Sequence, residues 1–402
     1  MQNKAIRRGS ERIIKGILAM SAAFTSLTVV LIIIFLFREG ISVFKEKPVE
    51  KGFELAVNST NPVKTIKPAL VKKIFDGEIT NWRDLGGKDQ KIKLFTINDL
   101  DQYFNEEELG KNFINLPTRI SELVAKEPGI LADIPNKYIK KGFSGNLLEV
   151  KKITVWDFLS GMEWFPTARP VALFGIWPMI LGTLLVTLGA IIMALPFALA
   201  TAIYMAEVAD SRIRSVLKPV IELLAGIPSV VYGFFGLVII VPLIQRVFNL
   251  PVGETGLSGS VVLAIMILPT IITITEDALR NCPNSIRQAS LALGATKWQT
   301  IRRVVLPYSI SGITTAVILG VGRAFGETMA VLMVTGNAAV VPHTILEPMR
   351  TITATIAAEL GEASQGGLHF KALFALGCIL FIITFLTNIV VQWVSNKQKL
   401  SR

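Results

Sequence analysis

The chain has 402 residues, of which 51% are hydrophobic and only 18% are charged, and its formal net charge is +11. An ordinary soluble domain has about 25% charged residues, and disordered chains are poorer in apolar residues. The composition therefore excludes a disordered chain and argues against a nucleic-acid-binding protein, in spite of the basic excess.

Six apolar runs are long enough to cross a membrane, which takes roughly 20 residues as a helix. The first run, 17–37, follows a basic segment and ends at Phe37-Arg38-Glu39. It is too long for a signal peptide and lacks a small-residue cleavage site, so we predict an uncleaved anchor. The other runs lie at about 176–206, 219–245, 259–275, 309–335 and 371–394. The predicted fold class is an all-α polytopic membrane protein with six transmembrane helices.

Lys and Arg in the connecting segments predict the orientation, because basic residues are retained on the cytoplasmic side. An inside N-terminus places 16 of them inside: five before residue 16, then Arg212, Arg214, Lys218, Arg280, Arg287, Lys297, Arg302, Arg303, Lys397, Lys399 and Arg402. The short outer loops hold only Arg246, Arg350 and Lys371. We expect both termini to be cytoplasmic, in a multi-pass protein of the bacterial inner membrane.

Residues 39–170 form a long polar insert with 20 basic and 19 acidic residues. Short runs at Phe53–Val57, Ile92–Ile97 and Gly129–Ile134 are typical of strands, and Pro68–Phe75 of a helix. We predict three regions: 1–38, the cytoplasmic N-terminus and first helix; 39–170, an extracytoplasmic α+β domain; and 171–402, a five-helix membrane core.

Part of this insert resembles the periplasmic phosphate-binding proteins, on IFDGEITNWRDLGGKDQKI (74–92), the preceding TNPVKTIK and the later EPGILADIP. In that family, Ser and Thr hydroxyls and backbone N–H groups in Ser-Gly-rich turns hold phosphate. The insert has no such turn. It is therefore interpreted as a docking surface for a binding protein, a regulatory lobe or a packed remnant, with free phosphate binding as the alternative.

Several features of the core predict close helix packing. Pro196, Pro228, Pro242 and Pro269 fall within the runs and predict kinks. A stripe of small residues lets another helix approach closely and is interpreted as packing rather than as a substrate path: Ala190, Ala194, Ala198, Ala202 and Ala206. Trp156, Trp164 and Trp177 are expected in an interfacial aromatic belt.

The segment between the fourth and fifth runs, about 277–307, has the pattern of two short helices. Ile286–Leu293 is helical in character, Gly294 interrupts it, and a basic amphipathic helix follows and ends at Leu306-Pro307. Such a pair suits a surface that seats in a groove of another protein. The alternative is a hairpin that binds anionic lipid headgroups.

This segment is similar to the coupling motif of ABC importer permeases, which docks in the cleft of the ATPase. The matching positions are Gln288, Ala289, Ser290, Gly294, Val304, Leu306 and Pro307, and Ala295 belongs to the same stretch. Gln288 replaces the Glu of the family, which leaves a salt bridge at that position open.

Arg323 and Glu327 lie four residues apart within the fifth run, so they are expected to share a helix face. Counted from Ser309, Arg323 lies about 21 Å along the helix, well inside the hydrocarbon. A charge there costs about 2.5–3.5 kcal/mol, so it is expected to face a partner or a water-filled path. Mutual neutralisation of the pair is one interpretation; the other is a route for an anion, because Arg presents a planar donor fork to phosphate oxygens.

GRAFGETMAV (322–331), PSVVYGFFGLVIIVPL (228–243) and TEDALRNCPNSIRQASLALGA (275–295) closely resemble the phosphate permease subunits of bacterial ABC importers, and Met329-Ala330-Val331 points to the PstC type. The resemblance implies the type I importer permease core, with Arg323, Glu327 and Thr328 on the substrate path. It implies as partners a PstA-like second permease, a PstB-like ATPase, a PstS-like binding protein, phosphate and the lipid bilayer.

The sequence contains no GxxxxGK[ST] motif, so we expect no enzyme activity in this chain and ATP and Mg²⁺ bound by the partner ATPase. His343, His369, Cys282 and Cys378 provide no metal-ligand set. Glu207 and Glu222 are expected to be interfacial or ATPase-facing. The rival functions are a permease for another oxyanion, such as molybdate or sulfate, and a membrane phosphate sensor.

Overall fold

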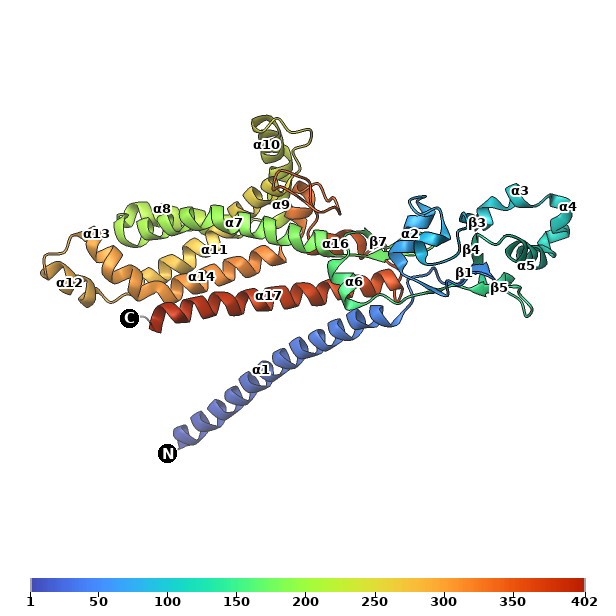
Figure 1. Cartoon of the computed structure of the whole chain (residues 1–402). Coiled ribbons are helices and arrows are strands. Elements are labelled where there is room, and N and C mark those ends of the chain that lie inside the picture. Colours follow the sequence, from blue (N-terminus) through green and yellow to red (C-terminus); the bar gives the residue numbers. More distant parts are fainter. Residues whose placement is uncertain (1, 401–402) are drawn as a thin grey trace.

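The computed structural model describes the backbone of residues 2–400 and the side chains of residues 14–105, 107–110 and 112–393. A helical bundle and a smaller α+β lobe lie at opposite ends of an elongated molecule (Figure 1). Six helical segments of the described chain are long and apolar enough to cross a membrane: Ile14–Lys45, Trp177–Val208, Ser229–Val247, Gly256–Arg280, Lys297–Gly326 and Leu368–Trp393. The predicted six-helix fold with an inserted α+β region is confirmed.

Helix α11 (Gly256–Arg280) forms the centre of the bundle, between α7 (Trp177–Ile203) and α14 (Leu306–Gly326). Small residues permit this contact: a Cβ at Gly189 of α7 would lie 2.5 Å from the Ser260 hydroxyl of α11. Ala190, Ala194, Ala198 and Ala202 are almost fully buried. The interpretation of this stripe as packing is therefore confirmed.

Helix α17 (Leu368–Leu400) packs on α14 and on the C-terminal part of α1 (Gln2–Ser42). Gly40 of α1 meets Ala375 and Cys378, and Leu36 meets Gly377. Farther from the lobe, α1 diverges from the bundle (Figure 1) and its apolar side chains are exposed. Lipid or another transmembrane helix suits such a surface, because each apolar side chain left in water costs free energy.

The third span differs from its prediction. Residues 211–225 form a separate helix, α8 (Ser211–Ala225), and the span comprises α9 (Ser229–Phe235), a π-helical turn at Gly236–Ile240 and α10 (Val241–Val247). The predicted range of 219–245 was wrong because Pro228 does not kink a span. It precedes α9 with an extended backbone and separates it from α8. Pro196 and Pro269 do lie inside helices, α7 and α11.

The lobe is built on a four-stranded sheet of order β3-β4-β1-β5. Strand β1 (Phe53–Asn58) pairs antiparallel with β4 (Ile130–Pro135) and β5 (Gly145–Leu147), and β3 (Lys93–Thr96) runs parallel to β4. Helix α2 (Pro68–Phe75) contributes Val71 and Ile74 to the apolar cluster of Leu55 and Leu131, whereas α5 (Leu116–Lys126) packs with Ala132. The predicted strands and the helix at 68–75 are confirmed.

Shorter elements complete the chain. In the lobe they are β2 (Thr65–Ile66), α3 (Leu100–Tyr103), α4 (Glu106–Leu109), β6 (Glu149–Val150), α6 (Val155–Ser160), β7 (Trp164–Phe165) and β8 (Leu173–Phe174). In the bundle they are α12 (Asn284–Ala292), α13 (Lys297–Thr300), α15 (Met329–Val334) and α16 (Ile352–Glu359). The region boundaries at 38 and 170 stay predictions: α1 continues to Ser42, and the β7–β8 pair lies on both sides of residue 170.

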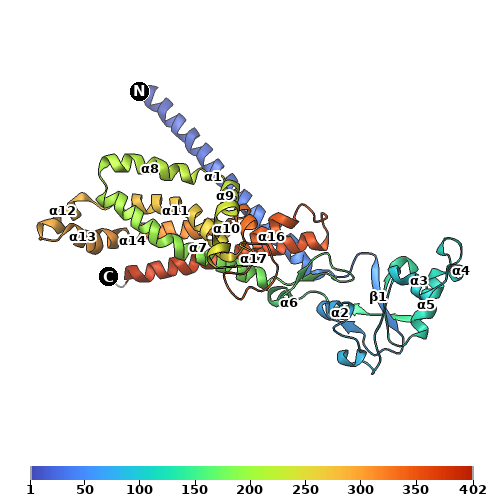
Figure 2. The ribbon, with the colours of Figure 1, turned by 90° about the horizontal axis from the view of Figure 1, so that it is seen from above.

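Both ends of the described chain lie at the end of the bundle that carries α12 and α13, opposite the lobe (Figures 1 and 2). This arrangement agrees with an even number of spans but does not test which side is cytoplasmic, so the orientation stays a prediction. Some basic residues behind it lie outside the described side chains: Lys4, Arg7, Arg8, Arg12, Lys397, Lys399 and Arg402.

Candidate functional site

Arg323 lies in the last turn of α14, inside the membrane-spanning bundle. Its Nη1 atom donates a hydrogen bond of 3.0 Å to the Thr270 hydroxyl of α11. No carboxylate of the described side chains lies within ion-pair distance of this guanidinium. The partly buried cation therefore keeps donors for a further acceptor.

The expectation that Arg323 and Glu327 share a helix face was wrong. Helix α14 ends at Gly326, and Glu327 has an extended backbone with ψ of 133°. The Glu327 carboxylate instead accepts a hydrogen bond of 3.3 Å from the N–H of Ala330, in the first turn of α15. Arg323 and Glu327 therefore do not neutralise each other as an ion pair.

Helix α16 supports this break in the fifth segment. The Thr353 hydroxyl donates to the backbone oxygen of Glu327 at 2.7 Å. A shallow, open cavity of about 520 Å³ lies alongside, and Thr328 and Thr353 line it together with aliphatic residues. Arg323, Glu327 and Thr328 therefore lie at one helix-to-helix junction, although whether they form the substrate path stays a prediction.

The predicted coupling segment has the expected helix, glycine and helix. Helix α12 ends at Ala292, Gly294 has a φ of +83°, and α13 begins at Lys297. Only glycine adopts such a φ without strain. The Ser290 and Thr300 hydroxyls lie 3.0 Å apart and join the two helices. Gln288 and Ala289 are exposed, and so are two large apolar side chains that the sequence analysis did not single out, Leu293 (90% exposed) and Trp298 (60%).

The prediction that the second helix ends at Leu306-Pro307 was wrong. A π-helical turn at Ile301–Val305 leads directly into α14. The Leu306 N–H bonds to the oxygen of Ile301, five residues back, and this wider turn accommodates Pro307 within the first turn of α14. Val304, Leu306 and Pro307 consequently belong to one helical rod that connects the coupling segment to the membrane.

Arg287 attaches α12 to the end of the second span. Its Nη2 atom lies 2.6 Å from Glu207, and its guanidinium also donates to the backbone oxygens of Leu279 and Cys282. Glu207 is only 11% exposed, so its side chain offers little surface for an ATPase to contact. It lies at the end of the second span, and its expected interfacial position stays a prediction. From the sequence, Arg287 was assigned only a role in orientation, because no local pattern reveals a partner 80 residues away.

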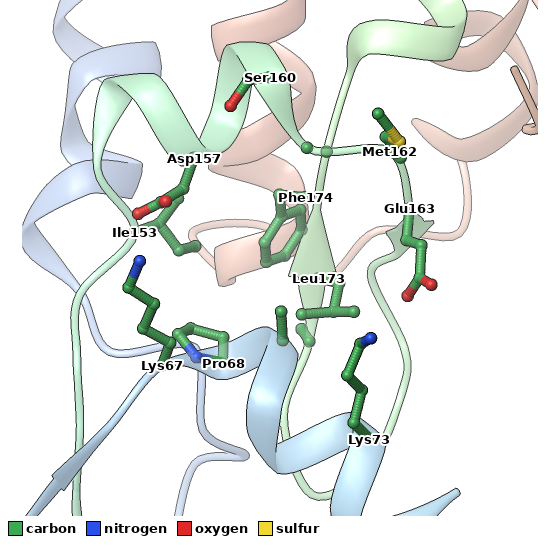
Figure 3. A pocket seen from close by; sticks show the side chains of 14 residues that line it. Lys67, Pro68, Lys73, Ile153, Asp157, Ser160, Met162, Glu163, Leu173 and Phe174 are labelled. Atoms are coloured by element: carbon green, nitrogen blue, oxygen red, sulfur yellow. The ribbon is translucent and has the colours of Figure 1, made fainter. Parts of the chain in front are cut away.

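A cavity of about 370 Å³ lies between α2 and the segment from α6 to β8, with Phe174 and Leu173 in its wall (Figure 3). Lys67 and Lys73 on its rim are matched by Asp157 and Glu163, as Figure 3 shows. Equal numbers of cations and carboxylates give no field that selects an anion. Its lining therefore does not favour phosphate binding by the lobe.

Two family profiles match the chain. Residues 198–400 match the binding-protein-dependent transport system inner membrane component, and residues 39–138 match a PBP superfamily domain.

The chain is also similar to individual proteins of known family. It is 41% identical over 250 residues to a probable ABC transporter permease protein, YqgH, of Bacillus subtilis, covering 62% of this chain and 81% of that protein. It is 37% identical over 257 residues to the phosphate transport system permease protein PstC of Mesorhizobium japonicum, covering 59% and 77%. A solved inward-facing structure of the MetNI methionine ABC transporter superposes with a TM-score of 0.42 and 18% identity, covering 56% of this chain and 94% of that one.

Proposed function

This chain belongs to the binding-protein-dependent inner membrane components of ABC importers, and from that membership we propose that it is a PstC-type permease subunit that imports inorganic phosphate. It is an integral membrane transport subunit. Arg323 supports an anionic substrate, because it is a cation within the bundle that no described carboxylate neutralises. The similarity to proteins named phosphate permeases supports phosphate as the anion.

In this proposal Arg323 holds the anion transiently. Thr270 fixes one N–H of the guanidinium and leaves the others for phosphate oxygens, which a planar fork binds well. Glu327 opposes tight binding by its charge, and Thr328 offers a hydroxyl beside it. Because Glu327 also bonds to the first turn of α15, anion passage and the position of that helix would be coupled.

The Arg323→Gln variant is expected to lower phosphate uptake by the reconstituted importer roughly 10- to 100-fold, since a hydrogen bond to a charged group contributes about 1.5–3 kcal/mol. Thr270→Ser, which keeps the hydroxyl, serves as the matched control. Both variants should assemble with their partners normally. Wild-type uptake by Arg323→Gln would remove the proposed role.

We also propose that the ATPase, with its ATP and Mg²⁺, docks on the surface formed by Gln288, Ala289, Ser290, Gly294 and Ala295, with Val304, Leu306 and Pro307 behind it. The exposed Leu293 and Trp298 supply apolar anchors, the kind of side chain that dominates interface energies. The complete importer would contain a second, PstA-like permease and receive phosphate from a PstS-like binding protein on the side of the lobe. Both termini would then be cytoplasmic, with α12 and α13.

Gly294→Ala tests this docking surface. An added Cβ meets no atom within 4 Å, so the strain arises only from the φ of +83° and amounts to about 1–2 kcal/mol. Copurification of the ATPase is expected to fall several-fold. Gly142→Ala in the lobe, at φ +95° and equally unobstructed, is the matched control. Equal ATPase retention by both variants would contradict the docking surface, and would favour a membrane sensor instead.

Another oxyanion, such as molybdate or sulfate, is the second candidate, because a guanidinium alone does not distinguish tetrahedral anions. Uptake of labelled phosphate in competition with each oxyanion separates the two.

For the lobe, whose family profile is that of a PBP-like domain, we propose docking of the binding protein rather than capture of free phosphate, since the rim charges of its cavity are balanced. Equilibrium dialysis with phosphate tests this.

A further inference from the structure

An apolar groove runs between α7 and α14 at the end of the bundle that carries the coupling segment. Its volume is about 340 Å³. Aliphatic side chains of both helices form its walls, and a single cation stands at one end, Arg302: the walls are Leu199, Ile203, Leu306, Pro307, Ile310 and Ile313.

The position of this groove places its two ends in different surroundings. The residues from Leu306 to Ile313 cover about 10 Å of α14 at 1.5 Å per residue, within a span long and apolar enough to lie in hydrocarbon. Arg302 lies one turn nearer to α13, toward the membrane surface. The groove is therefore apolar along its length and cationic only at the level of the lipid headgroups.

The cations at this end of the bundle include some that are paired with a carboxylate and some that are not. Arg214, Arg280 and Arg287 each lie within 4 Å of a carboxylate. Within the described residues, Arg302 and its neighbour Arg303 have no carboxylate at that distance and are exposed, but only Arg302 lines the groove. The unpaired charge of Arg302 thus favours an anion at this end of the groove, and the aliphatic walls favour a hydrocarbon chain attached to that anion.

We propose that this groove binds an anionic phospholipid, with its phosphate on Arg302 and one acyl chain between α7 and α14. Basic pockets between transmembrane helices at the membrane surface are suited to such headgroups. A free phosphate ion would satisfy only Arg302 and would leave the apolar walls uncovered. The inference holds for any cargo and does not depend on the proposed role of Arg323.

The bound lipid would act on the coupling segment. Its site includes the π-helical turn at Ile301–Val305 and the start of α14, through which α13 is continuous with the membrane. A lipid in the groove would fix the distance between α7 and this rod. Transport is therefore expected to be faster in bilayers that contain phosphatidylglycerol than in phosphatidylcholine alone.

The test measures phospholipid retained by the intact importer. The complex is reconstituted in nanodiscs of phosphatidylglycerol and phosphatidylcholine, re-extracted in mild detergent and analysed by native mass spectrometry. Wild type is expected to retain phosphatidylglycerol selectively. Arg302→Gln should reduce that selectivity about fivefold, the effect of one basic residue at the surface. Arg303→Gln, the adjacent exposed arginine outside the groove, is the matched control and should retain it.

A second variant tests the apolar part independently. Ile310→Trp fills the groove while Arg302 remains, and it should lose the retained lipid although the local charge is unchanged. Equal losses from Arg302→Gln and Arg303→Gln would overturn the site in favour of general attraction to headgroups. Retention by Ile310→Trp, displacement of the lipid by millimolar inorganic phosphate, or no selectivity in wild type would also overturn it.

Discussion

Glu276 is completely buried near the end of α11, and three cations surround its carboxylate. Arg214 lies at 2.7 Å, Lys218 at 3.2 Å and Arg280 at 3.6 Å. Two of these come from α8, so a charge that would be costly alone fixes that helix against the bundle. Arg323 is the contrasting case, because its one described side-chain partner is a neutral hydroxyl. A charged side chain inside a span whose hydrogen-bond donors are only partly satisfied indicates a functional residue.

Asp133 is a second incompletely satisfied charge, in the lobe. It is 9% exposed, and its Oδ1 atom has no hydrogen-bond partner in the described part of the chain. By the alternation of β4 it faces the same side as Leu131, toward an apolar cluster. Burial raises the pKa of Asp133 to about 6; the nearby Glu50 acts in the same direction, and Arg169 opposes it.

This pKa predicts that the lobe loses stability as the pH rises. The folded state binds the proton more tightly than the unfolded state, so the stabilising contribution is complete below about pH 4 and is lost as the pH rises through 6. The loss amounts to about 3 kcal/mol at most. Asp133→Asn should remove this dependence and protect the lobe at pH 8. Hydrogen exchange of residues 130–135, corrected for intrinsic rates, measures it; the exposed Asp84→Asn should change nothing.

At the scale of elements, the coupling segment is positioned from both sides. The Glu207–Arg287 pair attaches α12 to the end of the second span, and the π-helical turn joins α13 to α14. A motion of α12 and α13 would therefore move α7 and α14 as rigid bodies. The break at Glu327 and Thr328 lies at the other end of α14, beside Arg323. One helix thus connects the predicted docking surface to the predicted substrate site.

Removing one partner of the Glu207–Arg287 pair should release α12. Arg287→Ala leaves Glu207 buried without its cation, and breaking such a pair costs about 3–5 kcal/mol. Exchange protection of residues 284–292 should fall, and transport should fall with it. Glu222→Gln, an exposed carboxylate of α8, is the control. If the double variant Glu207→Gln/Arg287→Ala is no worse than Arg287→Ala, the pair acts as a unit; additive losses would contradict this coupling.

Many of the helices and turns were predictable from local sequence patterns. The long apolar runs predicted six spans, and Gly294 between two amphipathic stretches predicted the turn of the coupling segment. The errors arose where a local pattern has two structural outcomes. Pro228 was compatible with a kink or with a helix start, and the spacing of Arg323 and Glu327 assumed a continuous helix. Contacts from α16, through Thr353, favour the break instead.

In the whole molecule, one junction of side chains fixes the lobe to the bundle. Glu359 of α16 is the centre of this junction: its Oε2 atom lies 2.9 Å from the Trp164 indole nitrogen and 2.8 Å from His369, and its Oε1 atom lies 2.6 Å from Arg350. Trp164 is 3% exposed, so its expected place in an interfacial belt was wrong. Lys371 and Glu46 add an ion pair between α17 and the segment entering the lobe.

Glu359→Gln is predicted to loosen the lobe from the bundle. Although burial opposes ionisation, the bonds from His369 and Trp164 and the charge of Arg350 keep the pKa of Glu359 below its usual value. The charged form therefore stabilises the junction at neutral pH, and this contribution is lost as the pH falls through that lowered pKa. Exchange of residues 164–175 should increase several-fold in the variant. The exposed Glu362→Gln is the control, and equal protection in both variants would contradict the prediction.

The membrane class, the number of spans, the polar insert and the family could be predicted from the chain alone, because hydrophobic length and motif spacing are local properties. The pairing of charges, in contrast, depends on how the helices pack. Glu207 meets Arg287, Glu359 meets Arg350, and Arg323 remains without a described carboxylate. Such partners come together through helix packing rather than through sequence spacing. In this molecule, that pairing separates the charges that hold the fold together from those proposed to serve transport.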